Sequence, residues 1–332
     1  MKKNKTSYSA SIITYCRAYH AAHDELKIFD DFLAKHLLTE EQRTNFDGMI
    51  YKSNKALYYI GSRKAVPSII KLFLPRRVKR TFEAIAPQDL NLISSPTSAV
   101  DWYMHAHGAP ALAVSRARYT EDSLAEVVRK GGRQYVILGA GMDTFAFRCP
   151  ELMEKLQVFE VDHPATQAFK RQRLTELGWE IPKQLHFIPV DFTRQKLDEE
   201  LKNSSYDPKA LGFFNWLGVT YYLPRETVFD TLRTVAGIAP TGSTVIFDYL
   251  DADAFDPVKV APRGQWFLWS HKAGETMKSG FEPSALSHDL AALGLRLKEN
   301  LSPSDIEKLY FQGHPGNYHA QEHVHFACAI VE

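Results

Sequence analysis

The chain has 332 residues, of which 45% are hydrophobic and 24% charged, and its formal net charge is +1. This length allows one elaborated domain or a core with a smaller lid. The balanced charge excludes a general electrostatic attraction to nucleic acid or to an anionic membrane surface. No run approaches the roughly 18 apolar residues of a membrane span, and the basic start leads into no apolar signal core. We therefore expect a soluble, cytoplasmic protein without nucleic-acid or membrane partners, and the sequence leaves the oligomeric state open.

The first part of the chain, residues 1–125, carries helical hydrophobic patterns. Apolar residues recur near helical spacing over 11–23, over 25–38 and from 40 to beyond 51, with no strand alternation of any length between them. We expect this part to form a helical cap or lid. The basic run Lys71–Arg80 is interpreted as the start of a solvated helix after Pro75, because the whole chain is balanced in charge.

From about residue 133 onward, short apolar runs alternate with helix-like stretches, as they do in βαβ units. Seven such runs fit a doubly wound α/β sheet with one late antiparallel hairpin. They are 135–138, 158–161, 185–190, 212–217, 243–249, 295–299 and 323–331.

The first of these runs enters a glycine turn, Gly139-Ala140-Gly141, and the second ends in Asp162. A buried parallel strand, a Gly-x-Gly turn and an acid at the end of the next strand form the adenosine half-site of a Rossmann-like sheet, in which the acid accepts hydrogen bonds from the ribose hydroxyls. The third run ends in Asp191 and Phe192, so that a carboxylate can accept from the adenine amino group while the ring covers the base. An N-cap role for Asp162 is the competing interpretation.

The same half-site serves NAD and S-adenosylmethionine. The dinucleotide fingerprint requires a third glycine, and Thr144 stands in its place. Asp143 is a poor neighbour for a diphosphate but is compatible with a cationic amino-acid tail. These two residues favour S-adenosylmethionine, whose α-carboxylate needs a cation. The candidate for this cation is Arg116, which precedes the first strand on a segment that leads into a helix over 122–129. Spacing alone hardly separates Arg116 from Arg118.

The runs Tyr135–Arg148, Val158–Ala165 and Trp216–Pro224 resemble the leucine carboxyl methyltransferase superfamily of class I S-adenosylmethionine-dependent methyltransferases, in particular its bacterial branch associated with O-methylation in secondary metabolism. The similarity covers about residues 110 to 250, and Ile28–Asp31 fits more loosely. The resemblance implies an α/β, Rossmann-like, seven-stranded doubly wound sheet of strand order 3-2-1-4-5-7-6, its last strand antiparallel, with an N-terminal helical cap. The cofactor-binding core would span residues 126–332.

The resemblance also implies how the cofactor is bound and where this chain departs from the family. Arg116 would bind the carboxylate, the glycine turn would lie against the ligand, Asp162 would bind the ribose, and Asp191 with Phe192 the adenine. In many relatives the fourth strand ends in a glutamate, and this chain has Leu217 at that position. The polar contact that the glutamate makes in those relatives is therefore in doubt here. Asn215 and Tyr221 are the candidates to replace it. The full set of expected cofactor contacts is Arg116, Gly139, Ala140, Gly141, Asp143, Asp162, His163, Asp191, Phe192 and Gly218.

Methyl transfer to a carboxylate needs no general base because the acceptor is already ionised at neutral pH, whereas a phenol or alcohol would need one. His105, His107, Tyr221 and Tyr222 are the candidate bases, and Tyr222, which matches the family's motif tyrosine, is expected to orient the acceptor oxygen. The aromatic stretch 255–283 is expected to supply an apolar pocket wall. The expected substrate-pocket residues are His105, Tyr221, Tyr222, Trp266 and Trp269.

The favoured function is therefore methylation of a carboxylate on a hydrophobic or polyketide-like small molecule, with release of S-adenosylhomocysteine. Three alternatives remain: a hydroxyl or phenol acceptor, a nicotinamide oxidoreductase built on the same half-sheet, and a cofactor-binding protein without turnover. We expect no metal site, because the histidines between His314 and His325 match no zinc spacing. Cys16, Cys149 and Cys328 also lack a metal or redox spacing and are expected to be reduced.

Overall fold

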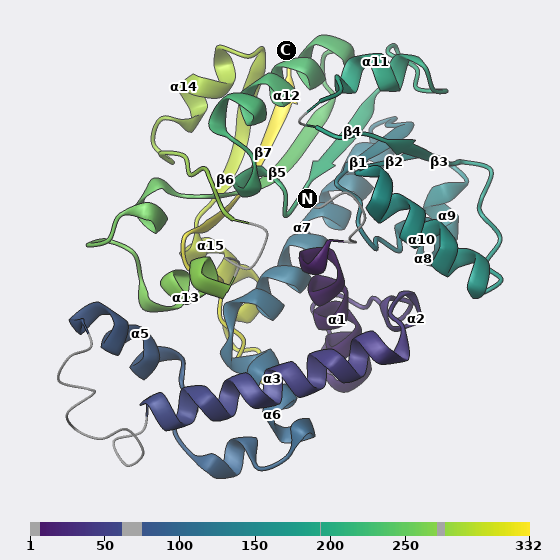
Figure 1. The fold of residues 1–332 in the computed structure, drawn as a ribbon. Coiled ribbons are helices and arrows are strands. Elements are labelled where there is room, and N and C mark those ends of the chain that lie inside the picture. Colours follow the sequence, from purple (N-terminus) through teal and green to yellow (C-terminus); the bar gives the residue numbers. More distant parts are fainter. Residues whose placement is uncertain (1–6, 62–74, 193, 271–275) are drawn as a thin grey trace.

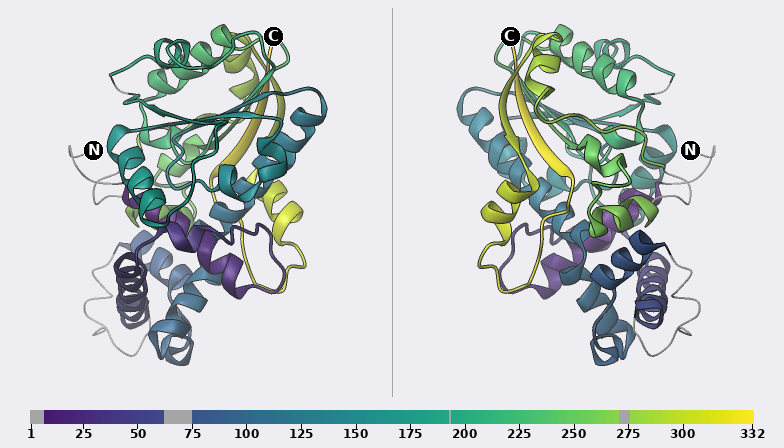
Figure 2. Two further views of the ribbon diagram at one scale, coloured as in Figure 1. Left: turned by 90° about the vertical axis from the view of Figure 1, so that its right-hand side faces the viewer. Right: turned by 90° about the vertical axis from the view of Figure 1, so that its left-hand side faces the viewer.

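The computed structural model describes residues 7–61, 75–192, 194–270 and 276–332. A twisted sheet carries helices on both faces, and the N-terminal helices gather beyond one end of it (Figures 1 and 2). The strand order is β3-β2-β1-β4-β5-β7-β6, and β7 is antiparallel to both of its neighbours, which confirms the predicted topology. The strands are β1 Gln134–Leu138, β2 Gln157–Asp162, β3 Leu185–Pro189, β4 Gly212–Trp216, β5 Thr244–Leu250, β6 Leu295–Leu301 and β7 Val324–Val331.

The central strands β1, β4 and β5 are buried at every position, as expected for parallel strands with helices on both sides. Their alternate side chains enter two different cores. Tyr135 and Ile137 of β1 join the core under α7, whereas Val136 and Leu138 join the core under α12. The helical elements of this part are α8 Phe145–Arg148, α9 Pro150–Met153, α10 Pro164–Glu176, α11 Leu197–Lys202, η2 Thr220–Tyr222, α12 Arg225–Ile238, η3 Ala252–Phe255, α13 Pro262–Ser270, α14 Leu286–Ala291, α15 Pro303–Ile306 and η4 Glu307–Phe311.

The N-terminal part is helical, as predicted, but one predicted helix is wrong. Helices α1 and α3 occupy the predicted ranges, whereas only the last turn of the predicted helix 25–38 forms. The reason is that His20 Nε2 accepts the backbone N–H of Ile28 at 2.8 Å, and that of Phe29 at 3.3 Å, so these groups are not available to a helix. The elements are α1 Tyr8–His23, α2 Ala34–Leu37, α3 Glu40–Gly61, α5 Arg76–Ile85, η1 Leu90–Ile93, α6 Pro96–Ala106 and α7 Gly108–Arg129.

Helix α7 connects the N-terminal helices to the sheet. It runs unbroken through the predicted boundary at residue 125, and the helix predicted over 122–129 is only its last part. Its neighbours include α1 and α6 on one side and β4 and β5 on the other. The predicted basic helix begins after Pro75, as α5, while residues 71–74 lie outside the described residues. Among the described helices, none combines the length and apolarity needed to cross a membrane.

Asp31 fastens the N-terminal helices to the turn after β1. Its side chain is only 1% exposed and accepts hydrogen bonds from Arg17 Nε at 2.8 Å and from Thr144 Oγ1 at 2.6 Å. Arg17 Nη2 also donates to the carbonyl of Met142 at 2.9 Å. Thr144, the residue in place of the third fingerprint glycine, is thus used as an anchor.

The Asp31 anchor gives a stability prediction. Asp31→Asn leaves the cation of Arg17 without its buried partner, and we expect the free energy of unfolding to fall by about 3 kcal/mol. The control Asp30→Asn removes an exposed carboxylate 3.3 Å from Lys27 Nζ and should cost less than about 0.5 kcal/mol. Urea denaturation of both variants measures the difference, and equal losses would contradict this account of the anchor.

Candidate active site

The glycine turn after β1 has a backbone that few other residues can adopt. Gly139 and Gly141 have φ values of +76° and +54°. The N–H groups of Gly139 and Ala140 donate to the carbonyl of Val161 at 2.7 and 3.2 Å, which ties the turn to β2. A Cβ on Gly139 would lie 2.4 Å from Val219 Cγ2. Conformation and space both select glycine here.

Asp162 ends β2 and points back to this turn. Its carboxylate accepts the N–H of Gly141 and, at 2.6 Å, that of His163. Burial raises the pKa of Asp162, and these two N–H groups oppose the rise. The N-cap of α10 is His163, whose Nδ1 accepts from Ala165 N at 3.2 Å. The carboxylate of Asp162 is therefore directed at the glycine turn and not into α10.

Asp191 and Phe192 follow β3 at the same edge of the sheet. Asp191 Oδ2 lies 4.0 Å from His163 Nε2, and the ring centroid of Phe192 lies 6.3 Å from that of Trp216 at the end of β4. Asp162, Asp191 and Phe192 therefore lie at the carboxyl ends of the neighbouring strands β2 and β3, and Asp162 contacts the glycine turn. The sequence predicted this arrangement from the residue that follows each strand.

Arg116 is buried on α7 and is bound from two sides. Its Nη1 donates to Asp248 Oδ2 at 2.9 Å and to the Tyr221 hydroxyl at 3.3 Å. Asp248 Oδ1 accepts the N–H of Gly218 at 2.6 Å. A Cβ on Gly218 would lie 2.9 Å from both terminal nitrogens of Arg116, so the guanidinium lies directly against this glycine. Burial raises the pKa of Asp248, and the charge of Arg116 opposes that rise.

Asp248 is the residue that sequence reasoning missed. Its signal was a single acid inside the apolar run 244–250, which is fully buried in β5. Leu217, in the place of the family glutamate, is partly buried against the core under α7. Of the two side chains suggested to compensate, Asn215 donates to the Tyr135 hydroxyl at 3.0 Å, and Tyr221 contacts Arg116. The carboxylate that Arg116 contacts comes from the neighbouring strand.

The start of α1 covers the glycine turn. A Cβ on Gly141 would lie 3.2 Å from the Cβ of Ala10, and the Ser9 hydroxyl lies 3.3 Å from that of Tyr222. Figure 1 shows α1 in front of the sheet end from which β1 leads into this turn. Asp143, also expected at the site, accepts the N–H of Phe145, the first residue of the short helix α8, at 2.7 Å.

Of the two candidate histidines, His105 lies in α6, and His107 lies between α6 and α7. His105 Nε2 lies 3.1 Å from Asp24 Oδ1, and its Nδ1 lies 2.9 Å from the carbonyl of Asp101. The hydrogen bond to Asp24 raises the pKa of His105. His107 is buried, and burial together with the charge of Arg263 lowers its pKa to about 3. The structure therefore places neither imidazole in hydrogen-bond contact with Arg116.

Trp266 and Trp269, expected in the pocket wall, belong to α13, which packs against α5. Trp266 packs against the cluster of Leu57 and Ile85, and the ring centroid of Trp269 lies 6.4 Å from that of Phe82. A role for either ring in acceptor binding stays a prediction. Residues 271–275 of the same stretch lie outside the described residues.

The C-terminal histidines converge on one carboxylate. His323 Nδ1 lies 2.8 Å from Asp251 Oδ1, and His325 Nε2 lies 3.4 Å from Asp251 Oδ2. His323 precedes β7 and has a φ of +68°, so its predicted place in the strand is wrong. Within the described ranges, no group of three or more His, Cys, Asp or Glu side chains is arranged to hold a metal ion.

The comparisons with known proteins agree with this architecture. The family model "Leucine carboxyl methyltransferase" matches residues 10–236. The Bacillus subtilis protein YktD, which carries the provisional name of an S-adenosyl-L-methionine-dependent methyltransferase, is 35% identical over 99% of both chains. A Mycobacterium tuberculosis protein of the same provisional description, Rv3399, is 32% identical over 42% of this chain and 41% of its own. The structure of a DUF574 family protein from Streptomyces avermitilis has a TM-score of 0.50 at 15% identity, over 85% of this chain and 96% of that one.

The fold is that of the class I S-adenosylmethionine-dependent methyltransferases. The chain belongs to the leucine carboxyl methyltransferase family. Family membership confirms the methyltransferase prediction and decides against a nicotinamide oxidoreductase.

The turn at Gly139 can be tested with a matched glycine. Gly139→Ala combines a left-handed backbone with a contact to Val219, whereas Gly178→Ala has a similar φ of +67° and no atom within 4 Å of the added Cβ. The strained backbone alone costs about 1 kcal/mol. We expect Gly178→Ala to cost about that much and to leave S-adenosylhomocysteine binding unchanged, and Gly139→Ala to cost more and to weaken binding at least tenfold. Thermal unfolding and calorimetry measure both quantities. Identical behaviour of the two variants would contradict the packing of the turn.

Proposed function

We propose that Arg116, Asp162, Asp191 and Phe192 bind S-adenosylmethionine at the ends of β1 to β4. The observation that supports this most strongly is that groups of suitable chemistry follow or flank the carboxyl ends of neighbouring strands: Asp162 bonds to Gly141, Asp191 lies by His163, Phe192 lies by Trp216, and the buried guanidinium of Arg116 lies against Gly218. The lack of a side chain at Gly218 lets the guanidinium of Arg116 lie directly against the backbone, and the lack of one at Gly139 lets Val219 pack on the turn. The donor set fits the cofactor's carboxylate, ribose and adenine.

The proposed cofactor supplies a methyl group that is already electrophilic on a sulfonium, so the chain's own residues act by position. Arg116, oriented by Asp248 and Tyr221, fixes the amino-acid end. Asp162 fixes the ribose. The start of α1, held over the turn through Ala10 and Ser9, excludes water from the place where an acceptor oxygen must approach in line.

We further propose that the acceptor is a carboxylate of a hydrophobic small molecule. Of the candidate general bases, His105 is held by Asp24, and the ring of His107 is buried against those of Trp102 and Tyr103. Tyr221 is buried against Arg116, and burial raises the pKa of its hydroxyl well above the usual value. An acceptor that is ionised at neutral pH needs none of these groups. Tyr222, beside Ser9, then serves to orient the acceptor oxygen.

The proposed cofactor contacts predict that two substitutions weaken cofactor binding. Asp162→Ala and Arg116→Gln should each weaken binding of S-adenosylhomocysteine at least tenfold, which is about 1.4 kcal/mol. Arg118→Gln is the matched control, because Arg118 is exposed and pairs with Asp122 at 2.7 Å on the same helix. Isothermal calorimetry on variants that retain the wild-type far-ultraviolet circular dichroism measures the effect. Unchanged affinity in both variants would place the cofactor elsewhere.

The acceptor class predicts the chemical lability of the product. With methyl-labelled S-adenosylmethionine and a panel of hydrophobic acids, phenols and alcohols, we expect label in a product that releases volatile methanol on mild alkaline treatment, as methyl esters do and ethers do not. Tyr222→Phe should lower turnover about tenfold without altering its pH profile, since the tyrosine orients and does not abstract a proton. Alkali-stable label, or a lost basic limb in Tyr222→Phe, would favour a hydroxyl acceptor. Cofactor binding without any labelled product would favour a protein without turnover.

A further inference from the structure

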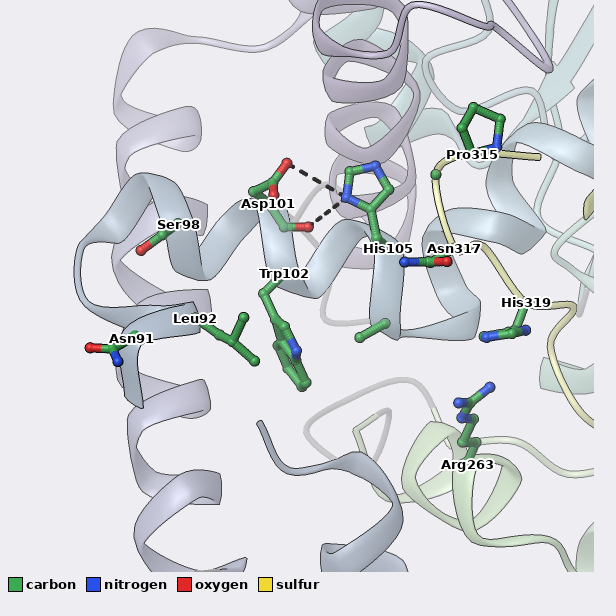
Figure 3. A pocket seen from close by; sticks show the side chains of 12 residues that line it. Asn91, Leu92, Ser98, Asp101, Trp102, His105, Arg263, Pro315, Asn317 and His319 are labelled. Atoms are coloured by element: carbon green, nitrogen blue, oxygen red, sulfur yellow. Dashed lines mark hydrogen bonds and ion pairs between the residues drawn. The ribbon is translucent and has the colours of Figure 1, made fainter. Parts of the chain in front are cut away.

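A cavity of about 720 Å³ lies just before the start of α7, between α6, η1, α13 and the loop 315–319 (Figure 3). This volume lies within the range of roughly 300–1,000 Å³ that is typical of small-molecule sites. None of the residues that line it is a proposed cofactor contact. One lining residue, His105, is also expected in the substrate pocket, so the cavity is distinct only from the proposed cofactor contacts.

The two sides of the cavity differ in chemistry. Leu92, Trp102 and Ala106 form an apolar wall on η1 and α6. Across from them, Arg263 of α13 extends toward His319 of the C-terminal loop, and the indole of Trp102 faces this pair in Figure 3. One side can cover a ring, and the other can bind a charged or polar group.

The carboxylates around the cavity already have partners. Asp101 accepts from the Tyr19 hydroxyl at 3.0 Å and lies on the His105 side, away from Arg263 (Figure 3). Glu307 lies 3.3 Å from His319 Nδ1 and also accepts the N–H of Ala320.

Glu322, beside α13, accepts the N–H of Gly264 at 3.0 Å. Over residues 7–61, 75–192, 194–270 and 276–332, no acid forms an ion pair with Arg263. Burial lowers the pKa of His107, and the charge of Arg263 adds to that lowering.

We propose that this cavity binds a planar organic anion, an aromatic carboxylate whose ring lies against Trp102 and Leu92 and whose carboxylate is held by Arg263. A guanidinium binds a carboxylate through two parallel N–H bonds, and an indole face adds area and stacking to a planar ring. His319 and Asn317 border the same polar side. The site goes beyond methyl transfer, since it uses no residue of the proposed cofactor site.

The probe for this site is 2-naphthoate, and its neutral counterpart is 2-naphthalenemethanol, which has the same ring system without the charge. Calorimetry on the full chain should show that the anion binds at least about tenfold more tightly than the alcohol, because only the anion uses Arg263. Saturating S-adenosylhomocysteine should leave this affinity unchanged, because the two sites share no residue.

Four variants separate charge from packing. Arg263→Gln should reduce the affinity for 2-naphthoate at least about tenfold and leave the alcohol within about twofold, whereas Arg263→Lys keeps the charge and should lose less. Trp102→Leu should weaken both probes by a similar factor. Arg233→Gln, which removes an exposed arginine paired with Asp230 on α12, is the matched control and should change neither probe.

The proposal is overturned if 2-naphthoate binds no better than the alcohol, if Arg263→Gln leaves its affinity unchanged, or if no binding is measurable at millimolar probe. Competition between 2-naphthoate and S-adenosylhomocysteine would also overturn it, because the anion would then occupy the cofactor site. Failure of S-adenosylhomocysteine to bind, with 2-naphthoate binding as expected, would count against the proposed function alone.

Discussion

The buried pair of Arg116 and Asp248 is the interaction on which the arrangement of this protein depends. Arg116 comes from α7, which also packs against the N-terminal helices, and Asp248 comes from the centre of the sheet. Removing two charges from water costs several kcal/mol per ion, and such pairs seldom exceed a hydrophobic contact in stability. The pair is better understood as a positioning device: Asp248 also binds the N–H of Gly218, so one carboxylate sets both the guanidinium and the adjacent turn.

A second buried carboxylate, Asp31, fixes the residues that follow the turn at Gly139 to Gly141. Asp31 holds Arg17 and Thr144, while Arg17 binds the carbonyl of Met142. The N-terminal helices are therefore fastened at two points on either side of the proposed cofactor site, and α1 reaches the turn itself through Ala10. This geometry explains why the helical part is better described as part of the site than as an independent module.

The cavity beside Trp102 lies just before the start of α7. Hydrogen bonds among His20, Asp24, His105 and Tyr318 join α1, α6 and the C-terminal loop near this end. Burial alone would raise the pKa of Asp24, but its hydrogen bonds from His105, His20 and Tyr318 lower it. The wall of the cavity is thus built on a tightly bonded frame, and an organic anion there would meet groups whose positions are already set.

The sequence alone determined the elements of this protein that depend on short-range patterns. Buried strands are continuous apolar runs, a left-handed turn demands glycine, and parallel strands bring the residues that follow them to one edge. These rules located the strands and the turn at Gly139, and the resemblance to the family supplied the strand order that the structure has. Tertiary structure decided what depends on partners distant in the chain. Asp248 lies 132 residues after Arg116, and Ala10 meets a turn at Gly141, so no local spacing could reveal either contact. The segment 25–33 has a helical pattern, yet the imidazole of His20 takes its backbone N–H groups, because a tertiary hydrogen bond outweighs a weak local preference.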